Sequence, residues 1–145
     1  MTKIQKSVLI NAPINEVEAI LDDPHRLPDW YAGVTAVQPT PNFPHEVGSH
    51  NKLTYKAGGL TMESTLTTIE SVPQQKRIFQ MDGMISGTNH WQLQANGRQT
   101  QVQFTMDYQM GGGGLGQLAN KLIIERMNDK NADESLTNLK QLVEG

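Results

Sequence analysis

Few residues in this chain have types and spacings that could do chemistry. His45 and His50 are spaced H-x4-H, but they lie in a segment of prolines and glycine with no third ligand nearby, and the chain has no cysteine. Because a zinc site needs three or four such ligands, we expect no metal. His25 is a candidate general base, although a solvated position at a helix start explains it better. The carboxylates of Asp22 and Asp23 are explained by helix capping.

The motifs of nucleotide sites, serine hydrolases and zinc proteases are absent. Gly111 to Gly114 do not continue into the lysine and hydroxyl residue of a phosphate loop, and the sequence contains neither G-x-S-x-G nor H-E-x-x-H. Four glycines between a strand and a helix indicate a flexible hinge instead. The sequence therefore predicts no cofactor and identifies no catalytic residue.

Length and composition narrow the class of protein. A chain of 145 residues has the size of one domain, and we expect residues 1–145 to form it. A net charge of −3 without runs of like charge argues against a nucleic-acid partner. The longest purely apolar runs are three residues, so no stable membrane insertion is expected. We expect a soluble, cytoplasmic protein, and its oligomeric state stays open.

The elements that must position any site follow a clear order. Residues 3–11 predict a strand, and two short helices follow, the first capped by Asn15 with Glu18 and the second over 24–32. A strand at 34–38 and a proline-rich loop come next. Five further strands are expected to form an antiparallel meander with glycine-containing turns, and they span 51–57, 60–70, 76–81, 84–94 and 99–110. The last stretch, 115–143, predicts a helix about 40 Å long.

Alternation along the meander assigns one face of each strand to the interior. The pattern is strongest at 102–110, where Val102, Phe104, Met106 and Tyr108 share a side. At 76–81 we choose Phe79 and Met81 as inward-facing, which also turns Arg77 inward. Arg77 and Tyr108 are then the titratable groups that the sheet offers to the interior.

The long helix has an interrupted apolar stripe. Leu118, Leu122 and Met127 recur at helical spacing, as do residues nearer the C-terminus, but 128–134 (NDKNADE) contains a single alanine. Either the helix is broken there, or that turn spans solvent beside a pocket mouth. We expect a helix that packs at both ends, is loosely held in its middle, and can lift about the glycine hinge.

Several segments carry a family resemblance: Ile10-Asn11-Ala12-Pro13 with Val17 and Leu21, Asp23-Pro24 with Leu27-Pro28-Asp29-Trp30-Tyr31, Gly87-Thr88 with Trp91-Gln92-Leu93, and Glu134-Ser135-Leu136 with Asn138-Leu139-Lys140. In these segments and in the order of its elements, the chain resembles the START-like (SRPBCC) superfamily, and most of all its polyketide cyclase/dehydrase and lipid-transport branch. The resemblance spans residues 4 to 144. It implies an α+β helix-grip fold, in which a seven-stranded curved antiparallel sheet and a long C-terminal helix enclose a cavity. It carries no catalytic signature.

Polar and small residues on the inner face favour a cavity over a dry core, since unpaired groups there would cost about 1–3 kcal/mol each. The residues expected to line it are Trp30, Tyr55, Met62, Ser64, Leu66, Phe79, Met81, Asn89, Trp91, Phe104, Met106, Tyr108, Leu118 and Leu122. The first hypothesis is a carrier or sensor of an apolar or amphipathic small molecule. The alternatives are a polyketide cyclase/dehydratase-type enzyme, and an interaction module with a filled core whose surface anchors are Trp30 and Tyr31.

Overall fold

The structure is a computed structural model that describes residues 2–57, 59–110 and 118–145, with side chains in the last range described from residue 121. The strands are β1 (Thr2–Ile10), β2 (Val34–Pro39), β3 (His50–Ala57), β4 (Leu60–Val72), β5 (Lys76–Gly83), β6 (Ile85–Asn96) and β7 (Gln99–Met110). The helices are α1 (Ile14–Leu21), the 3₁₀ turn η1 (Pro24–Arg26), α2 (Leu27–Trp30) and α3 (Leu118–Glu144).

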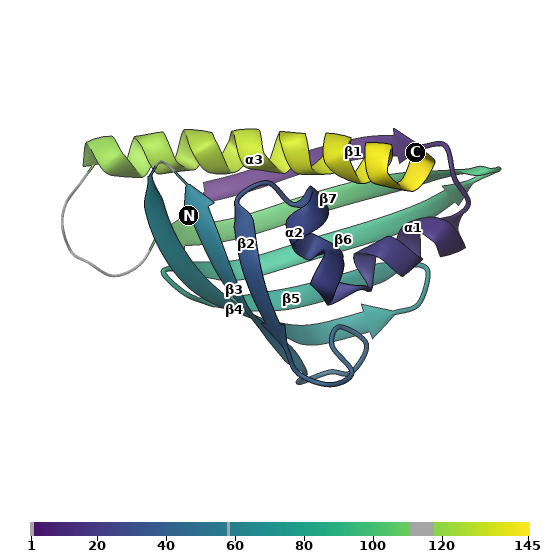
Figure 1. Cartoon of the computed structure of the whole chain (residues 1–145), viewed down its shortest axis with the longest axis horizontal. Helices are drawn as coiled ribbons and strands as arrows, with labels where there is room; N and C mark the ends of the chain where they lie inside the picture. The colour runs from purple at the N-terminus through teal and green to yellow at the C-terminus, as the bar shows by residue number, and fades with distance from the viewer. Residues whose placement is uncertain (1, 58, 111–117) are drawn as a thin grey trace.

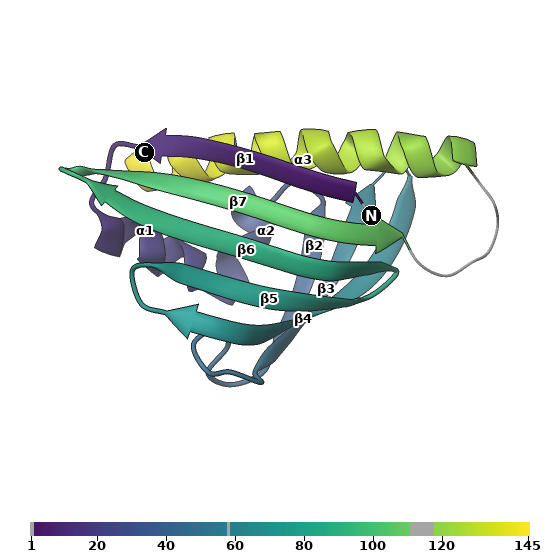
Figure 2. The ribbon, with the colours of Figure 1, turned by 180° about the vertical axis from the view of Figure 1, so that it is seen from behind.

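All seven strands form one antiparallel sheet in the order β1-β7-β6-β5-β4-β3-β2. The sheet curves, and α3 runs across its open side while α1 and α2 lie within the curve (Figure 1). Seen from behind, β1, β7, β6 and β5 stand in front of α1, α2 and α3, so these helices cover the same face of the sheet (Figure 2). The predicted α+β architecture, with its seven-stranded curved sheet and long C-terminal helix, is confirmed.

Alternation of side chains builds the concave face as predicted. In β7, Val102, Phe104, Met106 and Tyr108 are buried, and the residues that alternate with them are partly exposed. In β5, Arg77 is buried together with Phe79 and Met81. A period of two residues places one side of each strand against the core, so the sequence pattern determines which side that is.

An aromatic cluster attaches α2 to the centre of the sheet. The ring of Trp30 meets that of Trp91 on β6 edge to face at 5.5 Å, and Trp91 lies 4.3 Å from Phe104 on β7. Tyr31 completes the cluster, 6.1 Å from Phe104. Such contacts contribute about 0.5–1.5 kcal/mol each beyond the burial of area. They hold a four-residue helix that could not form alone.

The expectation of a break or a solvent-exposed turn at 128–134 is wrong. The helix α3 is continuous from Leu118 to Glu144. Asn128, Asn131 and Ala132 in its middle are buried, whereas Leu122 is 56% exposed. The physical reason is that Asn128 and Asn131 form hydrogen bonds with tyrosine hydroxyl groups of the sheet. The predicted hinge, Gly111 to Gly114, lies outside the described residues.

The predicted capping box of the first helix is also wrong. The helix α1 begins at Ile14 after Pro13, and no side chain in the described part of the chain caps it. Glu18 turns instead toward Arg77, whose guanidinium lies 3.2 Å from its carboxylate. The cap expected at Asp23 is present, because its carboxylate accepts a hydrogen bond from the backbone N–H of His25 at 3.2 Å.

Within the described residues, none of the helices is long and apolar enough to cross a bilayer.

The backbone at Gly87 predicts a sharp effect of substitution. Its φ is +142°, and a Cβ there would lie 2.0 Å from the carbonyl oxygen of Asp107 on β7. We expect Gly87→Ala to lower the free energy of unfolding by at least about 3 kcal/mol in urea denaturation.

The matched control is Gly97→Ala, where φ is +64° and no atom lies within 4 Å of the added Cβ. Gly97→Ala should lower the free energy of unfolding by only about 1–2 kcal/mol, which is the cost of placing alanine in a left-handed backbone conformation. Equal effects of the two substitutions would contradict the clash.

Candidate ligand cavity

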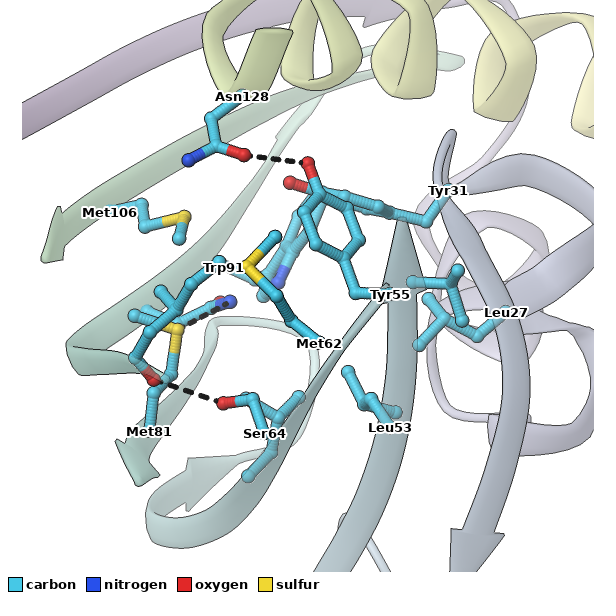
Figure 3. A pocket seen from close by; sticks show the side chains of 14 residues that line it. Leu27, Tyr31, Leu53, Tyr55, Met62, Ser64, Met81, Trp91, Met106 and Asn128 are labelled. Carbon is cyan, nitrogen blue, oxygen red and sulfur yellow. Dashed lines mark hydrogen bonds between the residues drawn. The ribbon is translucent and has the colours of Figure 1, made fainter. Parts of the chain in front are cut away.

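A cavity of about 80 Å³ lies between the concave sheet and α3, and we call it the central cavity. Its lining residues come from α2, α3 and most of the strands: Leu27, Tyr31, Val34, Leu53, Tyr55, Met62, Ser64, Leu66, Met81, Ile85, Asn89, Trp91, Met106 and Asn128. Figure 3 shows the methionine side chains of β4, β5 and β7 around it, with Asn128 reaching down from α3. The wall is mainly apolar.

The size of the central cavity limits what it holds without rearrangement. One water needs about 10–15 Å³ by this measure, so the space accommodates several waters. Sites that enclose drug-sized ligands measure about 300–1,000 Å³. Met62, Met81 and Met106 have flexible unbranched side chains that can repack at low cost. A ligand larger than a small fragment would therefore have to displace methionine side chains.

A hydrogen-bonded network connects α3 to the sheet at the edge of the central cavity. The hydroxyl of Tyr55 donates to Oδ1 of Asn128 at 2.9 Å and accepts from Nδ2 of Asn131 at 2.9 Å. Nδ2 of Asn128 donates to the hydroxyl of Tyr108 at 3.0 Å. All four residues are buried. Removing one member leaves polar groups unpaired, at about 1–3 kcal/mol each.

The same face of α3 also holds α2 and the chain that follows it. Oγ of Ser135 accepts from the backbone N–H of Ala32 at 2.8 Å, and Nδ2 of Asn138 donates to the carbonyl of Trp30 at 3.1 Å. Asn128, Asn131, Ser135 and Asn138 recur at helical spacing, so they form one polar stripe along α3. We call these four residues the polar stripe.

The titratable groups of the central cavity are phenols. Burial raises the pKa of Tyr55 to about 12, against a smaller lowering by the hydrogen bond from Asn131. Burial likewise raises the pKa of Tyr31, and the neighbouring Tyr55 and Tyr108 add to the effect. No carboxylate, imidazole, ammonium or guanidinium group occurs among the described lining residues. At neutral pH the site therefore offers neutral hydrogen-bonding groups and no ready base.

Two further polar side chains face the central cavity from the sheet. Oγ of Ser64 donates to the backbone carbonyl of Ile85 at 3.1 Å. Asn89 is 8% exposed, and its amide makes only a long contact of 4.0 Å to the sulfur of Met81, leaving Oδ1 without a partner among the described residues. Ser64 is thus satisfied by the fold, whereas Asn89 retains hydrogen-bonding capacity.

A second cavity of about 50 Å³ lies beside the first, under α1, η1 and α2. It is lined by Leu21, Asp23, Pro24, Leu27, Trp30, Phe43, Pro44, Asn51, Leu66, Arg77, Phe79 and Trp91. Leu27, Leu66 and Trp91 line both cavities, so the two spaces are separated by a single layer of side chains.

Arg77 lies at the edge of the second cavity in a buried ion-pair cluster. Its guanidinium lies 2.8 Å from Asp22 and 3.2 Å from Glu18, and it also donates to the carbonyl of Val72 at 2.8 Å. Burial raises the pKa of Asp22, although the hydrogen bond from Arg77 opposes the shift. The cluster joins α1 to β5, so Arg77 is engaged in structure rather than free for chemistry.

The structure brings together most of the residues expected to line a cavity. Those at the central cavity are Tyr55, Met62, Ser64, Leu66, Met81, Asn89, Trp91 and Met106. Trp30 and Phe79 line the second cavity. Phe104 and Tyr108 are fully buried and line neither. Leu122 is exposed on α3, because α3 turns its polar stripe inward, and the side chain of Leu118 is outside the described set.

The sequence reasoning missed six lining residues: Leu27, Tyr31, Val34, Leu53, Ile85 and Asn128. The alternation of inward and outward side chains marks Leu53 and Ile85, which share their strand faces with Tyr55 and Asn89. Asn128 is marked only by the helical spacing of polar residues along α3, whereas the prediction for this helix rested on its apolar residues. The sequence contains no comparable signal for Val34.

Comparison with known proteins gives a family and several similar structures. The family model described as polyketide cyclase / dehydrase and lipid transport matches residues 1–144. No curated protein matches the chain in sequence. The fold is similar to that of a Thermus thermophilus protein, with a TM-score of 0.81, 18% identity, and coverage of 98% of this chain and 97% of that one.

Two other solved structures share the fold. One is the Zhui aromatase/cyclase of a Streptomyces species, with a TM-score of 0.82, 15% identity, and coverage of 99% of this chain and 93% of that one. The other is a START superfamily protein of Mycobacterium smegmatis, with a TM-score of 0.76, 13% identity, and coverage of 98% and 97%. At these identities the likeness establishes the fold, which is the helix-grip fold predicted from the sequence.

The network at Tyr55 predicts a loss of stability on removal of one hydroxyl. Tyr55→Phe leaves the amides of Asn128 and Asn131 without this partner, so we expect the free energy of unfolding at pH 7 to fall by about 1–3 kcal/mol. The control is Tyr31→Phe, whose hydroxyl has no hydrogen bond to a described residue, and a change within about 0.5 kcal/mol is expected. An equal loss in both variants would contradict the network.

The raised pKa of Tyr55 predicts a specific loss of stability in alkali. The phenol ionises near pH 10 in the unfolded chain and near pH 12 in the folded one, so the unfolded chain loses its proton first as the pH rises. This contribution to stability is complete below pH 10 and declines between pH 10 and pH 12, by up to about 1.4 kcal/mol per pH unit. Urea titrations across this range should show a shallower decline for Tyr55→Phe, and an unchanged slope would contradict the assignment.

Proposed function

The chain belongs to the polyketide cyclase/dehydrase and lipid transport family of START-like proteins, and we propose that it binds a hydrophobic or amphipathic small molecule between the sheet and α3. The observation that carries the proposal is the central cavity, an apolar space with a few neutral polar groups at its edge. Sites for small molecules commonly have this composition.

The wall of the central cavity suits a ligand that is apolar over most of its surface. Leu53, Met62, Met81 and Met106 supply flexible apolar contacts, while Tyr31 and Asn89 supply hydrogen-bonding groups without partners among the described residues. The flexible methionines allow the cavity to expand around a guest, as an adaptable binding site requires. A carrier or sensor needs no more than this.

A polyketide cyclase/dehydratase activity is the second candidate, and the fold it shares with the Zhui aromatase/cyclase favours it. Such an enzyme needs a group that moves protons within the central cavity. The phenol of Tyr31 is placed there, whereas Tyr108 lies behind the wall and Arg77 is engaged by two carboxylates. Since burial keeps these phenols protonated at neutral pH, none serves as a ready base, and binding ranks first.

The interaction-module hypothesis receives no support from the placement of its anchors. It required a filled core and a surface role for Trp30 and Tyr31. Trp30 is 2% exposed and packs on Trp91, and Tyr31 lines the central cavity. Aromatic residues in these positions contribute to packing and to the cavity wall rather than to a protein interface.

Filling the central cavity should abolish binding. Leu53 on β3 lines the cavity, so Leu53→Trp should prevent uptake of the neutral fluorescent probe N-phenyl-1-naphthylamine, at a stability cost of about 1–3 kcal/mol for overpacking. The control is Lys56→Trp on the outer face of the same strand, which adds the same ring to solvent and should leave uptake unchanged.

Titration of probe fluorescence measures both variants against the wild type. Native mass spectrometry of the purified wild type provides a second readout through any co-purified apolar molecule. The binding proposal would be refuted if the wild type neither bound this probe nor carried a co-purified apolar molecule. Uptake unaffected by Leu53→Trp would show that the probe binds elsewhere.

The catalytic alternative is tested through Tyr31. With a synthetic poly-β-ketone thioester as substrate, Tyr31→Phe should lower kcat at least about 100-fold while weakening the naphthylamine probe by no more than about tenfold, the loss of one hydrogen bond, if the phenol donates a proton during cyclisation. Turnover unchanged by the substitution would exclude Tyr31. No turnover by the wild type above the uncatalysed rate would leave binding as the function.

A further inference from the structure

Three of the residues that line the second cavity carry a buried polar atom without a hydrogen-bond partner among the described residues. Nδ2 of Asn51, Nε1 of Trp30 and Nε of Arg77 are buried and have no hydrogen-bond partner among the described residues. All three are donors. Each residue lines the second cavity and is at least nine-tenths buried, with exposures of 0%, 2% and 7% respectively.

The assignment of the Asn51 amide follows from its other contact. Oδ1 of Asn51 accepts from the backbone N–H of Gln38 at 3.0 Å, so the free end of the amide is the NH₂ group. The indole N–H of Trp30 and the Nε–H of the Arg77 guanidinium are donors only. An unpaired buried donor is costly, and three beside one cavity indicate an occupant that supplies acceptor atoms.

The charges around the second cavity select among possible acceptors. The guanidinium of Arg77 is already balanced by Glu18 and Asp22, at 3.2 and 2.8 Å. Asp23 adds a further carboxylate to the lining. The guanidinium is thus paired with two carboxylates and a third carboxylate lines the space, so an anionic ligand group would be repelled and would lose its hydration on entry. An uncharged oxygen escapes both penalties.

We propose that the second cavity is a subsite for an uncharged, oxygen-bearing end of the ligand, such as a ketone or ester carbonyl, which accepts hydrogen bonds from Asn51 and Trp30 with Arg77 beside them. The inference rests on the proposed binding function and specifies the chemistry of the ligand. The apolar body of the molecule lies in the central cavity, and its oxygenated end passes between Leu27, Leu66 and Trp91, which border both spaces. Fatty acids and other carboxylates are disfavoured as ligands.

Three probes of one shape test the proposal in the wild-type chain. 2-Acetylnaphthalene carries the carbonyl, 2-isopropenylnaphthalene replaces its oxygen by a methylene group, and 2-naphthoate carries a carboxylate. Dissociation constants come from calorimetric titration. We expect the ketone to bind most tightly and naphthoate to bind at least about tenfold more weakly than the ketone.

Two substitutions complete a thermodynamic cycle with the ketone and its hydrocarbon analogue. Trp30→Phe removes the indole N–H and keeps an aromatic ring against Trp91. Asn51→Asp removes the NH₂ donor and keeps the oxygen that accepts from Gln38. In either variant the preference for ketone over hydrocarbon should fall roughly three- to tenfold, which corresponds to one hydrogen bond. A purely structural effect would weaken both probes equally and leave the ratio unchanged.

The outcomes separate this inference from the binding function on which it rests. A ketone preference that falls in a folded variant supports the subsite, and each variant tests it if the other fails to fold. Binding of ketone and hydrocarbon with the same ratio in wild type and variants would overturn the subsite but keep the binding function, since ordered water would then satisfy the donors. Naphthoate binding as tightly as the ketone would overturn the neutral-ligand assignment. Failure of all three probes to bind would overturn both.

Discussion

The structure depends on the hydrogen bonds that the polar stripe of α3 makes with the concave side of the molecule. Asn128 and Asn131 form hydrogen bonds with the hydroxyl groups of Tyr55 and Tyr108. The hydroxyl of Ser135 accepts a hydrogen bond from the backbone N–H of Ala32. Both tyrosines are buried, so an error in register along α3 would leave several polar groups unpaired in a medium of low dielectric constant. The stripe therefore determines where along the sheet the helix lies and which of its faces turns inward.

A polar contact between helix and sheet has a consequence for the space below it. Leu136 and Leu139 of α3 pack in the core, and an apolar side chain in place of Asn128 would extend this packing over the central cavity. Asparagine side chains instead meet the ends of long tyrosines, and this keeps α3 at a distance from the floor formed by Met62, Met81 and Trp91. The central cavity lies in the resulting gap, so its existence and the attachment of α3 have one physical cause.

The buried charged groups and the neutral polar groups of the central cavity lie in different parts of the molecule. The carboxylates of Glu18 and Asp22 pair with Arg77 under α1, while the central cavity contains phenols and amides whose protonation does not change near neutral pH. Burying the ion pairs costs hydration that their attraction must offset, which is consistent with the raised pKa of Asp22. This division favours recognition of neutral molecules over proton-transfer chemistry, and it is the reason that binding ranks above catalysis.

The sequence by itself determined the elements, their order and the inward face of each strand. Periodicity is a local property, and the alternation through Phe104 and Tyr108 has the same meaning in any surroundings. Because the cavity wall consists of inward strand positions, residues such as Met62 and Asn89 were predictable. The attachment of α3 was not, because the value of a buried asparagine depends on a partner more than seventy residues away in the chain, as for Tyr55 and Asn128. Only the tertiary structure decided that the polar stripe of α3 is buried beside its apolar residues Leu136 and Leu139, since the partners that satisfy the stripe come from distant segments of the chain.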